Sequence, residues 1–163
     1  EIDSNSINIT GETSEILKGI VPTLARASMN FTIDDLPEIS RRCKEKGVRT
    51  YLTLNTIIYD HDLSIIKTLL DKAKAADLTA VIAMDQAVIA YARQIGMEVH
   101  ISTQINITNI ETVKFYALFA DTMVMSRELS ITQIKKININ RICCCIQNYI
   151  ISNITCNISI EGC

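Results

Sequence analysis

The stretch V-H-I-S-T-Q-I-N-I-T-N, residues 99–109, decides the fold class of this chain. Val99 and Ile101 alternate with polar residues, which is the pattern of a β-strand with two different faces. The polar side chains at positions 100, 102 and 104 would share one of those faces. In an antiparallel sheet such a face often meets water, whereas a parallel sheet is usually covered on both sides. The type of sheet therefore determines whether these polar groups need partners.

Short strand-like runs alternate with helical patterns from Phe31 to Lys136. Four strands are predicted, at residues 48–54, 80–84, 99–102 and 122–125. Between them apolar residues recur at helical spacing, and Gly47 and Gly96 stop two of the helices. Because short connections join the alternating strands and helices, we predict parallel strands with right-handed crossovers. The fold class is therefore α/β, and the polar row of residues 99–109 is expected to be covered.

The two ends of the chain lack this regular pattern. Residues 1–24 show no clear period, and residues 138–163 consist almost wholly of Ile, Asn, Cys, Ser and Thr. Five of the six cysteines lie between Cys143 and Cys163. Neighbouring cysteines rarely converge on one metal ion, and this tail has no C-x-x-C pair. The spacing therefore argues against a metal site.

Composition limits the classes of function. The 163 residues suggest one domain, and a formal net charge of −2 provides no basic field for nucleic acid. The sequence has no apolar run long enough for a membrane helix and no signal-peptide pattern, so we expect a cytoplasmic location and no membrane partner. The phosphate-binding, zinc-protease and serine-hydrolase motifs G-x-G-x-x-G, H-E-x-x-H and G-x-S-x-G are also missing.

Polar residues follow each predicted strand. They are Asn55 and Thr56, Asp85 and Gln86, Ser102 to Gln104, and Ser126 to Glu128. In a parallel sheet these positions meet at the carboxyl edge, where binding sites form. Each of them also suits an ordinary helix cap, and that alternative stays open. Arg127 and Glu128 place two charges after an apolar strand, where a structural ion pair, with Asp85 or with each other, is the alternative to a ligand.

The two histidines receive different interpretations. His100 lies inside its strand, so a core histidine hydrogen-bonded to a neighbouring strand is the preferred interpretation. A proton-transfer or substrate-orienting role near the mouth of the sheet is the alternative. His61, in the triplet D-H-D, is interpreted as a solvated residue in the first turn of a helix.

The sequence resembles the collagenase-like peptidase family, which is grouped under the letter U as peptidases of unknown catalytic type. The resemblance lies in N-F-T (30–32), Y-L-T-L-N-T (51–56), D-Q-A-V-I (85–89), H-I-S-T-Q-I-N-I-T-N (100–109) and S-R-E-L-S (126–130), and it covers about residues 25–137. The opening strand of the family has no counterpart in residues 1–24, and the cysteines that bind a cluster in the family have no counterpart in the tail.

The resemblance implies a partial TIM-like (β/α) barrel over residues 25–137, between an irregular segment 1–24 and an irregular, low-complexity, Cys-rich tail 138–163. Some family members are collagen-degrading proteases. Others support RNA hydroxylation or ubiquinone synthesis with a cysteine-bound iron–sulfur cluster. The implied function is that of a fragment of a peptidase for peptide or collagen-like substrates, inactive alone. A fragment of an RNA-hydroxylation factor, whose cluster lies outside this chain, and an inactive remnant are the alternatives.

Nine positions match the family motifs and are the substrate-binding candidates: Asn55, Asp85, His100, Ser102, Gln104, Asn106, Asn109, Arg127 and Glu128. Arg127 is expected to bind an anionic or carbonyl group, and Asp85 or Glu128 to accept a proton. Gln104, Asn106 and Asn55 are expected to orient the substrate. No catalytic nucleophile is assigned, and no metal or cofactor is expected in this chain. The exposed edges of a partial barrel leave oligomerisation open.

Overall fold

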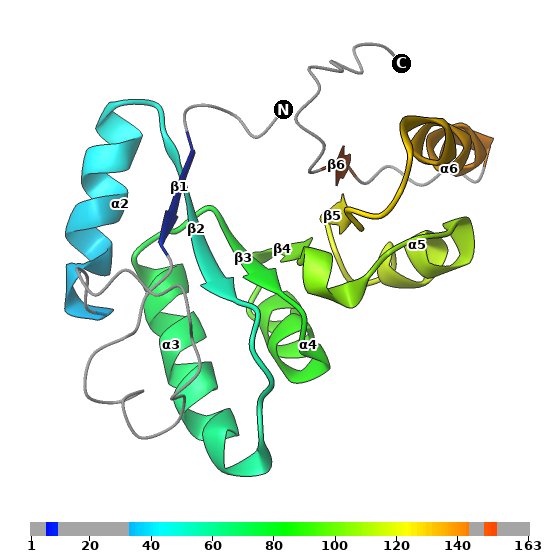
Figure 1. Ribbon diagram of the computed structural model, residues 1–163. Helices are drawn as coiled ribbons and strands as arrows, with labels where there is room; N and C mark the ends of the chain where they lie inside the picture. Colours follow the sequence, from blue (N-terminus) through cyan, green and yellow to red (C-terminus); the bar gives the residue numbers. More distant parts are fainter. Residues whose placement is uncertain (1–5, 10–32, 144–148, 153–163) are drawn as a thin grey trace.

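The computed structural model describes residues 6–9, 33–143 and 149–152, and its centre is one parallel sheet with helices packed against it (Figure 1). The strands are β1 (Ser6–Ile9), β2 (Arg49–Leu54), β3 (Ala80–Ala83), β4 (Glu98–Ile101), β5 (Thr122–Met125) and β6 (Tyr149–Ser152). The α-helices are α2 (Leu36–Glu45), α3 (Leu63–Ala75), α4 (Gln86–Gln94), α5 (Ile110–Tyr116) and α6 (Ile131–Cys143). Three short 3-10 turns are η1 (Ile33–Asp35), η2 (Asp60–Asp62) and η3 (Thr103–Ile105).

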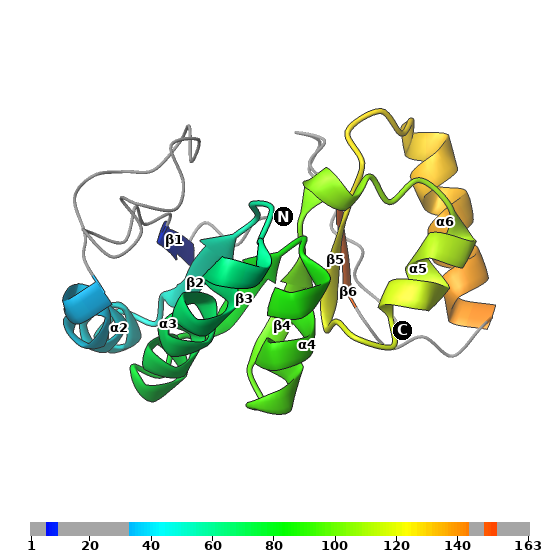
Figure 2. The ribbon, with the colours of Figure 1, turned by 90° about the horizontal axis from the view of Figure 1, so that it is seen from below.

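The order of the strands in the sheet follows their order in the chain, β1-β2-β3-β4-β5-β6, and all neighbours are parallel. Right-handed crossovers that always advance in one direction place every helix on the same face of the sheet. Figure 2 shows the helices along one side of the curved sheet. A doubly wound sheet would instead reverse its strand order and carry helices on both faces. The predicted α/β class with parallel strands is confirmed, and the one-directional strand order agrees with the expected partial (β/α) barrel.

The core lies between the sheet and the helices. Alternate strand residues face this side, and they include Leu52, Val81, Val99, Ile101 and Met123, each no more than 1% exposed. Leu36, Leu70, Val88, Ala92 and Val113 pack against them from helices α2 to α5. The helical stripes predicted from apolar spacing are therefore the faces buried against the sheet. Within the described ranges, none of the helices combines the length and apolar character needed to cross a membrane.

Helices α2, α3 and α4 end with the same backbone geometry. In each case a residue with positive φ follows the last turn: Gly47 (67°), Asp77 (58°) and Gly96 (69°). The next amide then reaches back to the helix, in the bonds Val48 N to Cys43 O, Leu78 N to Ala73 O and Met97 N to Ala92 O. This is a left-handed helix stop, which glycine adopts most readily. The helix ends predicted from Gly47 and Gly96 are confirmed, whereas the helix end at Asp77 was not predicted because no glycine marks it in the sequence.

Substituting Gly96 isolates the cost of this left-handed conformation. A Cβ added at Gly96 would meet no atom within 4 Å, so Gly96→Ala introduces backbone strain without a clash. We expect it to lower the free energy of unfolding by about 1 kcal/mol in chemical denaturation. The exposed helix residue Gln94, changed to alanine, is the control and should stay within about 0.5 kcal/mol of the unsubstituted chain. Equal losses in both variants would contradict this explanation.

The described residues contain two more strands than the four that the sequence predicted. β1 lies within the segment expected to be irregular, and β6 lies within the Cys-rich tail. Helix α6 also continues to Cys143, beyond its predicted end at Lys136. β1 and β6 are only four residues long and occur where Ile, Asn, Ser and Thr dominate. In such a composition apolar and polar residues alternate often, so a short strand cannot be recognised from this alternation. Pairing with β2 and β5 is a non-local contribution that local patterns do not contain.

Candidate functional site

The carboxyl ends of the strands form one edge of the sheet, here called the carboxyl rim. The register pairs Leu54 with Ala83, Ala83 with Ile101, and Ile101 with Met123, so these four strands end at the same edge. The residues that follow them therefore emerge on one rim: Asn55, Asp85, Ser102, Ser126, Arg127 and Glu128. The sheet brings these predicted residues to a common edge, while Gln104, Asn106 and Asn109 lie further along the connection after β4.

The connection after β4 begins at a buried serine. Strand β4 ends at Ile101, and Ser102, only 3% exposed, continues the ladder because its amide donates to the Ala83 carbonyl at 2.8 Å. The Ser102 hydroxyl accepts a hydrogen bond from the Gln104 amide at 3.4 Å and starts the turn η3. Gln104 itself is exposed in that turn. The expectation that Gln104 shares a strand face with His100 is therefore wrong, because the strand stops before it.

Asn106 and Asn109 have local structural tasks. Asn106 ends η3 in the left-handed conformation (φ 56°, ψ 52°), which asparagine tolerates better than most residues. The chain then returns to the sheet at the buried Ile107, which bridges to Met125 and accepts from the Ser126 amide at 3.0 Å. The Asn109 side chain caps α5 by accepting from the Thr112 amide at 2.9 Å. The polar spacing of residues 102–109 thus encodes a turn, a return to the sheet and a helix cap.

Asp85 connects two neighbouring segments of the rim. Its Oδ1 accepts from the Ala87 amide at 2.8 Å and caps α4. Its Oδ2 accepts a longer hydrogen bond, 3.4 Å, from the Ile58 amide in the connection after β2. The helix-cap alternative considered from sequence is therefore realised at Asp85, and the same carboxylate holds the neighbouring loop.

Two substitutions separate the capping task of Asp85 from a task that needs its charge. Asp85→Asn keeps a side-chain oxygen for the Ala87 amide, so we expect the free energy of unfolding to fall by less than about 0.5 kcal/mol. Asp85→Ala removes the cap and should cost about 1 kcal/mol in chemical denaturation. If the asparagine variant were as unstable as the alanine variant, the carboxylate charge and not the cap would be the stabilising feature.

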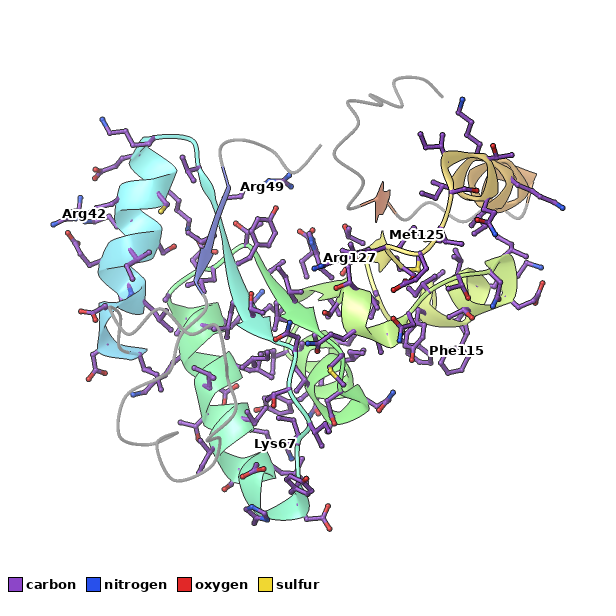
Figure 3. All side chains as sticks on the ribbon, viewed as in Figure 1. Arg42, Arg49, Lys67, Phe115, Met125 and Arg127 are labelled. Carbon is purple, nitrogen blue, oxygen red and sulfur yellow. The ribbon has the colours of Figure 1, made fainter. Side chains whose placement is uncertain are left out.

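Arg127 and Glu128 follow β5 and are both exposed. A Glu128 carboxylate oxygen contacts the Ser126 hydroxyl, which donates to it. The ion pairs considered from sequence, Arg127 with Asp85 or with Glu128, are not formed in the described part of the chain. Figure 3 shows Arg127 near Met125 at the end of β5, away from Phe115 on helix α5. Among the residues that the structure describes, the guanidinium thus has no ion-pair partner at the carboxyl rim.

His100 lies inside the sheet rather than at the rim. It is 6% exposed on the face opposite the helices, and its Nε2 lies 2.7 Å from Oε1 of Glu98 on the same strand. Its ring centroid is 5.1 Å from that of Tyr51, whose ring in turn lies 5.8 Å from the Arg49 guanidinium carbon. On the intervening strand β3, Ala80 pairs with Tyr51 and Ile82 pairs with His100. The geometry is that of the preferred core histidine, although its partner is on its own strand and not on a neighbouring one.

Two contacts of the candidate site residues were not predicted from the sequence. Glu98 lies two residues before His100, and starting the strand one residue earlier would have placed both on one face. Ser126 was noted as a strand end, but its contact with Glu128 depends on the turn that follows β5. Among the described residues, no group of three His, Cys, Asp or Glu side chains gathers as metal ligands. Cys43 is a buried free thiol, and the other cysteine side chains lie outside the described part.

Comparison with known proteins connects this architecture to a family. The family model described as Peptidase family U32 matches residues 7–160, a wider span than residues 25–137. A collagenase of Porphyromonas gingivalis is 47% identical over 114 residues, covering 70% of this chain and 28% of that protein. The uncharacterized protease MJ0090 of Methanocaldococcus jannaschii is 40% identical over 111 residues, covering 68% and 27%. The tRNA hydroxylation protein P1 of Bacillus subtilis is 28% identical over 110 residues, covering 66% and 26%.

The matched segment is a minor part of each relative, spanning just over a quarter of its length. No solved structure matches the chain significantly. The family match begins within β1 and extends past β6, so it includes all but the first residue of the two strands that were not predicted. The chain belongs to peptidase family U32.

Proposed function

We propose that this chain contributes a substrate-binding rim to a peptidase that acts on peptide or collagen-like substrates. The observation that carries the proposal is Arg127 at the carboxyl rim, which makes no ion pair with the described residues, in a chain that is 47% identical to a collagenase over 114 residues. Guanidinium groups bind carboxylates and carbonyl oxygens through paired N–H donors. Arg127 would hold a peptide carbonyl or carboxylate, and Asn55, which follows β2 on the same rim, would orient the chain.

Glu128 is the better candidate for a proton acceptor than Asp85. Both Asp85 oxygens already accept hydrogen bonds from backbone N–H groups, so they are less available to accept a proton from a substrate. The Glu128 carboxylate is exposed on the rim and contacts only the hydroxyl of Ser126 among the described residues. In this proposal Glu128 accepts a proton from a bound water as the water oxygen adds to the peptide carbonyl, and returns the proton to the amine nitrogen as the C–N bond breaks; no side-chain nucleophile is assigned. A cytoplasmic location and association through sheet edges remain predictions of the sequence.

RNA modification is the second candidate function. It is favoured by the relation to the tRNA hydroxylation protein, at lower identity than the relation to the collagenase. The iron–sulfur cluster implied for that branch does not fit the described residues, since they bring no three ligands together and their cysteine side chain, Cys43, is buried alone in helix α2. No step of either proposal therefore passes through a cluster held here.

One experiment separates the two candidates. The purified full chain is incubated with gelatin and, separately, with unmodified tRNA, and both products are analysed by mass spectrometry. The peptidase proposal expects new peptide termini in gelatin and no mass gain in the nucleosides. Oxygen added to a nucleoside, with gelatin left intact, would replace the proposal by its alternative. Intact gelatin and intact tRNA would contradict activity of either kind by this chain alone, which is the result that the family resemblance implies for a fragment.

A further inference from the structure

The connection between β2 and α3 exposes large side chains. Ile57 is 61% exposed and Tyr59 is 60% exposed. The Tyr59 ring stacks on the ring of His61, with centroids 5.7 Å apart and planes only 5° from parallel. The His61 side chain is itself 75% exposed, as expected for a first-turn residue, but it is not merely solvated. Single exposed apolar residues are common, whereas a stacked pair of exposed rings presents a continuous surface that a ligand can bind.

The backbone beneath these rings is held in place. Asp62 is 1% exposed, and its Oδ2 accepts from the Tyr59 amide at 3.0 Å while its own amide donates to the Tyr59 carbonyl at 2.8 Å. The Ile58 amide donates to Asp85 at 3.4 Å. A ligand that binds the rings therefore has little loop entropy to remove, which favours affinity.

This surface belongs to the carboxyl rim. The connection leaves β2 at its carboxyl end and runs past the sheet before α3 returns (Figure 1). Its bond to Asp85 ties it to the start of α4, another rim segment. The other exposed apolar group, which contains Phe115 and Leu118, lies where α5 leads into the amino end of β5. Exposed rings thus occur at both edges, but the Tyr59–His61 pair is on the edge that carries Arg127.

The charges around the rings select the kind of ligand. Asp60 and Asp62 flank His61, and Asp85 lies under the same loop. Among the described residues, the buried Asp62 Oδ1 has no hydrogen-bond partner and lies 3.4 Å from the His61 Nε2, so a carboxylate oxygen lies close to the ring. Phosphates would be repelled here, because like charges disfavour approach. A neutral extended peptide would not be repelled.

We propose that Tyr59 and His61 form a stacking subsite for a proline residue of an extended peptide bound along the carboxyl rim. Proline presents a compact, puckered ring whose C–H groups can pack against the negative face of an aromatic ring. Proline-rich segments are already extended before binding, and aromatic surfaces recognise them for this reason. Ile57 adds apolar surface beside the stack. The inference rests on the proposed peptidase function, because it names part of that substrate.

The test is peptide binding measured by fluorescence anisotropy on the full chain. The probe is a labelled proline-rich peptide, and the comparison probe has alanine in place of each proline. Tyr59→Ala should weaken binding of the proline probe about three- to tenfold, and Tyr59→Phe should keep it within about twofold. Phe115→Ala is the matched control, since it removes a similarly exposed ring at the other edge and should not change binding. Thermal unfolding of each variant verifies that the fold is retained.

The outcomes distinguish the subsite from the proposed function. Tyr59-dependent binding without gelatin hydrolysis would support the subsite and remove the peptidase. If gelatin is hydrolysed but Tyr59→Ala does not weaken binding of the proline probe, the subsite alone is overturned. The same holds if Phe115→Ala weakens binding as much as Tyr59→Ala does. The proposal also falls if a labelled single-stranded RNA depends on Tyr59 while the proline probe does not, because the rings would then stack on nucleobases.

Discussion

Leu70→Ala should lower the free energy of unfolding by about 2–5 kcal/mol, the largest effect expected of any single substitution considered for this chain. Leu70 is fully buried on helix α3, in the core between the sheet and the helices. Removing three carbons there loses their burial and leaves a cavity that the packed strands cannot close. Since a domain of this size is stabilised by only about 5–15 kcal/mol, the loss is a large fraction of the total.

Leu118→Ala is the matched control for Leu70→Ala. It makes the same chemical change at a side chain that is 71% exposed, so we expect a change within about 0.5 kcal/mol. Chemical denaturation followed by circular dichroism measures both variants. Similar losses at the two positions would mean that the helix layer is not packed on the sheet as described.

Under the proposed peptidase function, Arg127→Ala should lower kcat/KM for a gelatin-derived peptide by about 10- to 100-fold. A hydrogen bond to a charged group contributes about 1.5–3 kcal/mol, and this residue makes no compensating ion pair in the described part of the chain. Arg127→Lys should recover part of the activity, because lysine keeps the charge but loses the paired N–H geometry. The measurement is the initial rate of hydrolysis as a function of peptide concentration.

The control for Arg127→Ala is Arg42→Ala on helix α2. Arg42 is also an exposed arginine, with 73% of its side chain accessible, and it pairs with Glu38 away from the rim. Its loss should leave kcat/KM unchanged and alter stability only slightly, because exposed ion pairs contribute little. Activity retained by Arg127→Ala, or lost equally in both variants, would remove Arg127 from the proposed binding rim.

Local patterns were sufficient for the regular centre of the fold. The alternation around Val99 and Ile101 and the glycine stops at Gly47 and Gly96 reflect backbone and burial preferences that act within a few residues. They failed at Asp77, where a left-handed stop is made without glycine, and at β1 and β6, whose pairing partners are distant in sequence.

The residues of the candidate site were likewise only partly predictable from the sequence. The sequence identified polar residues after each strand but left open whether they cap helices or bind ligands. The structure decides this locally: Asp85, Ser102 and Asn109 accept backbone N–H groups. Arg127 remains without an ion pair in the described residues, and this depends on what other segments do or do not bring near it. The Tyr59–His61 stack likewise depends on the buried Asp62 that fixes the loop.

By itself the sequence determined that strands and helices alternate, that the strands run parallel and that their polar ends share one edge. These properties follow from side-chain periodicity and short connections, which act along the chain. Tertiary structure alone decided that all described helices cover one face, that His100 is enclosed beside Tyr51 and Glu98, and that Arg127 forms no ion pair with the described residues. Those outcomes depend on strand order and on contacts between distant residues, which local patterns do not specify.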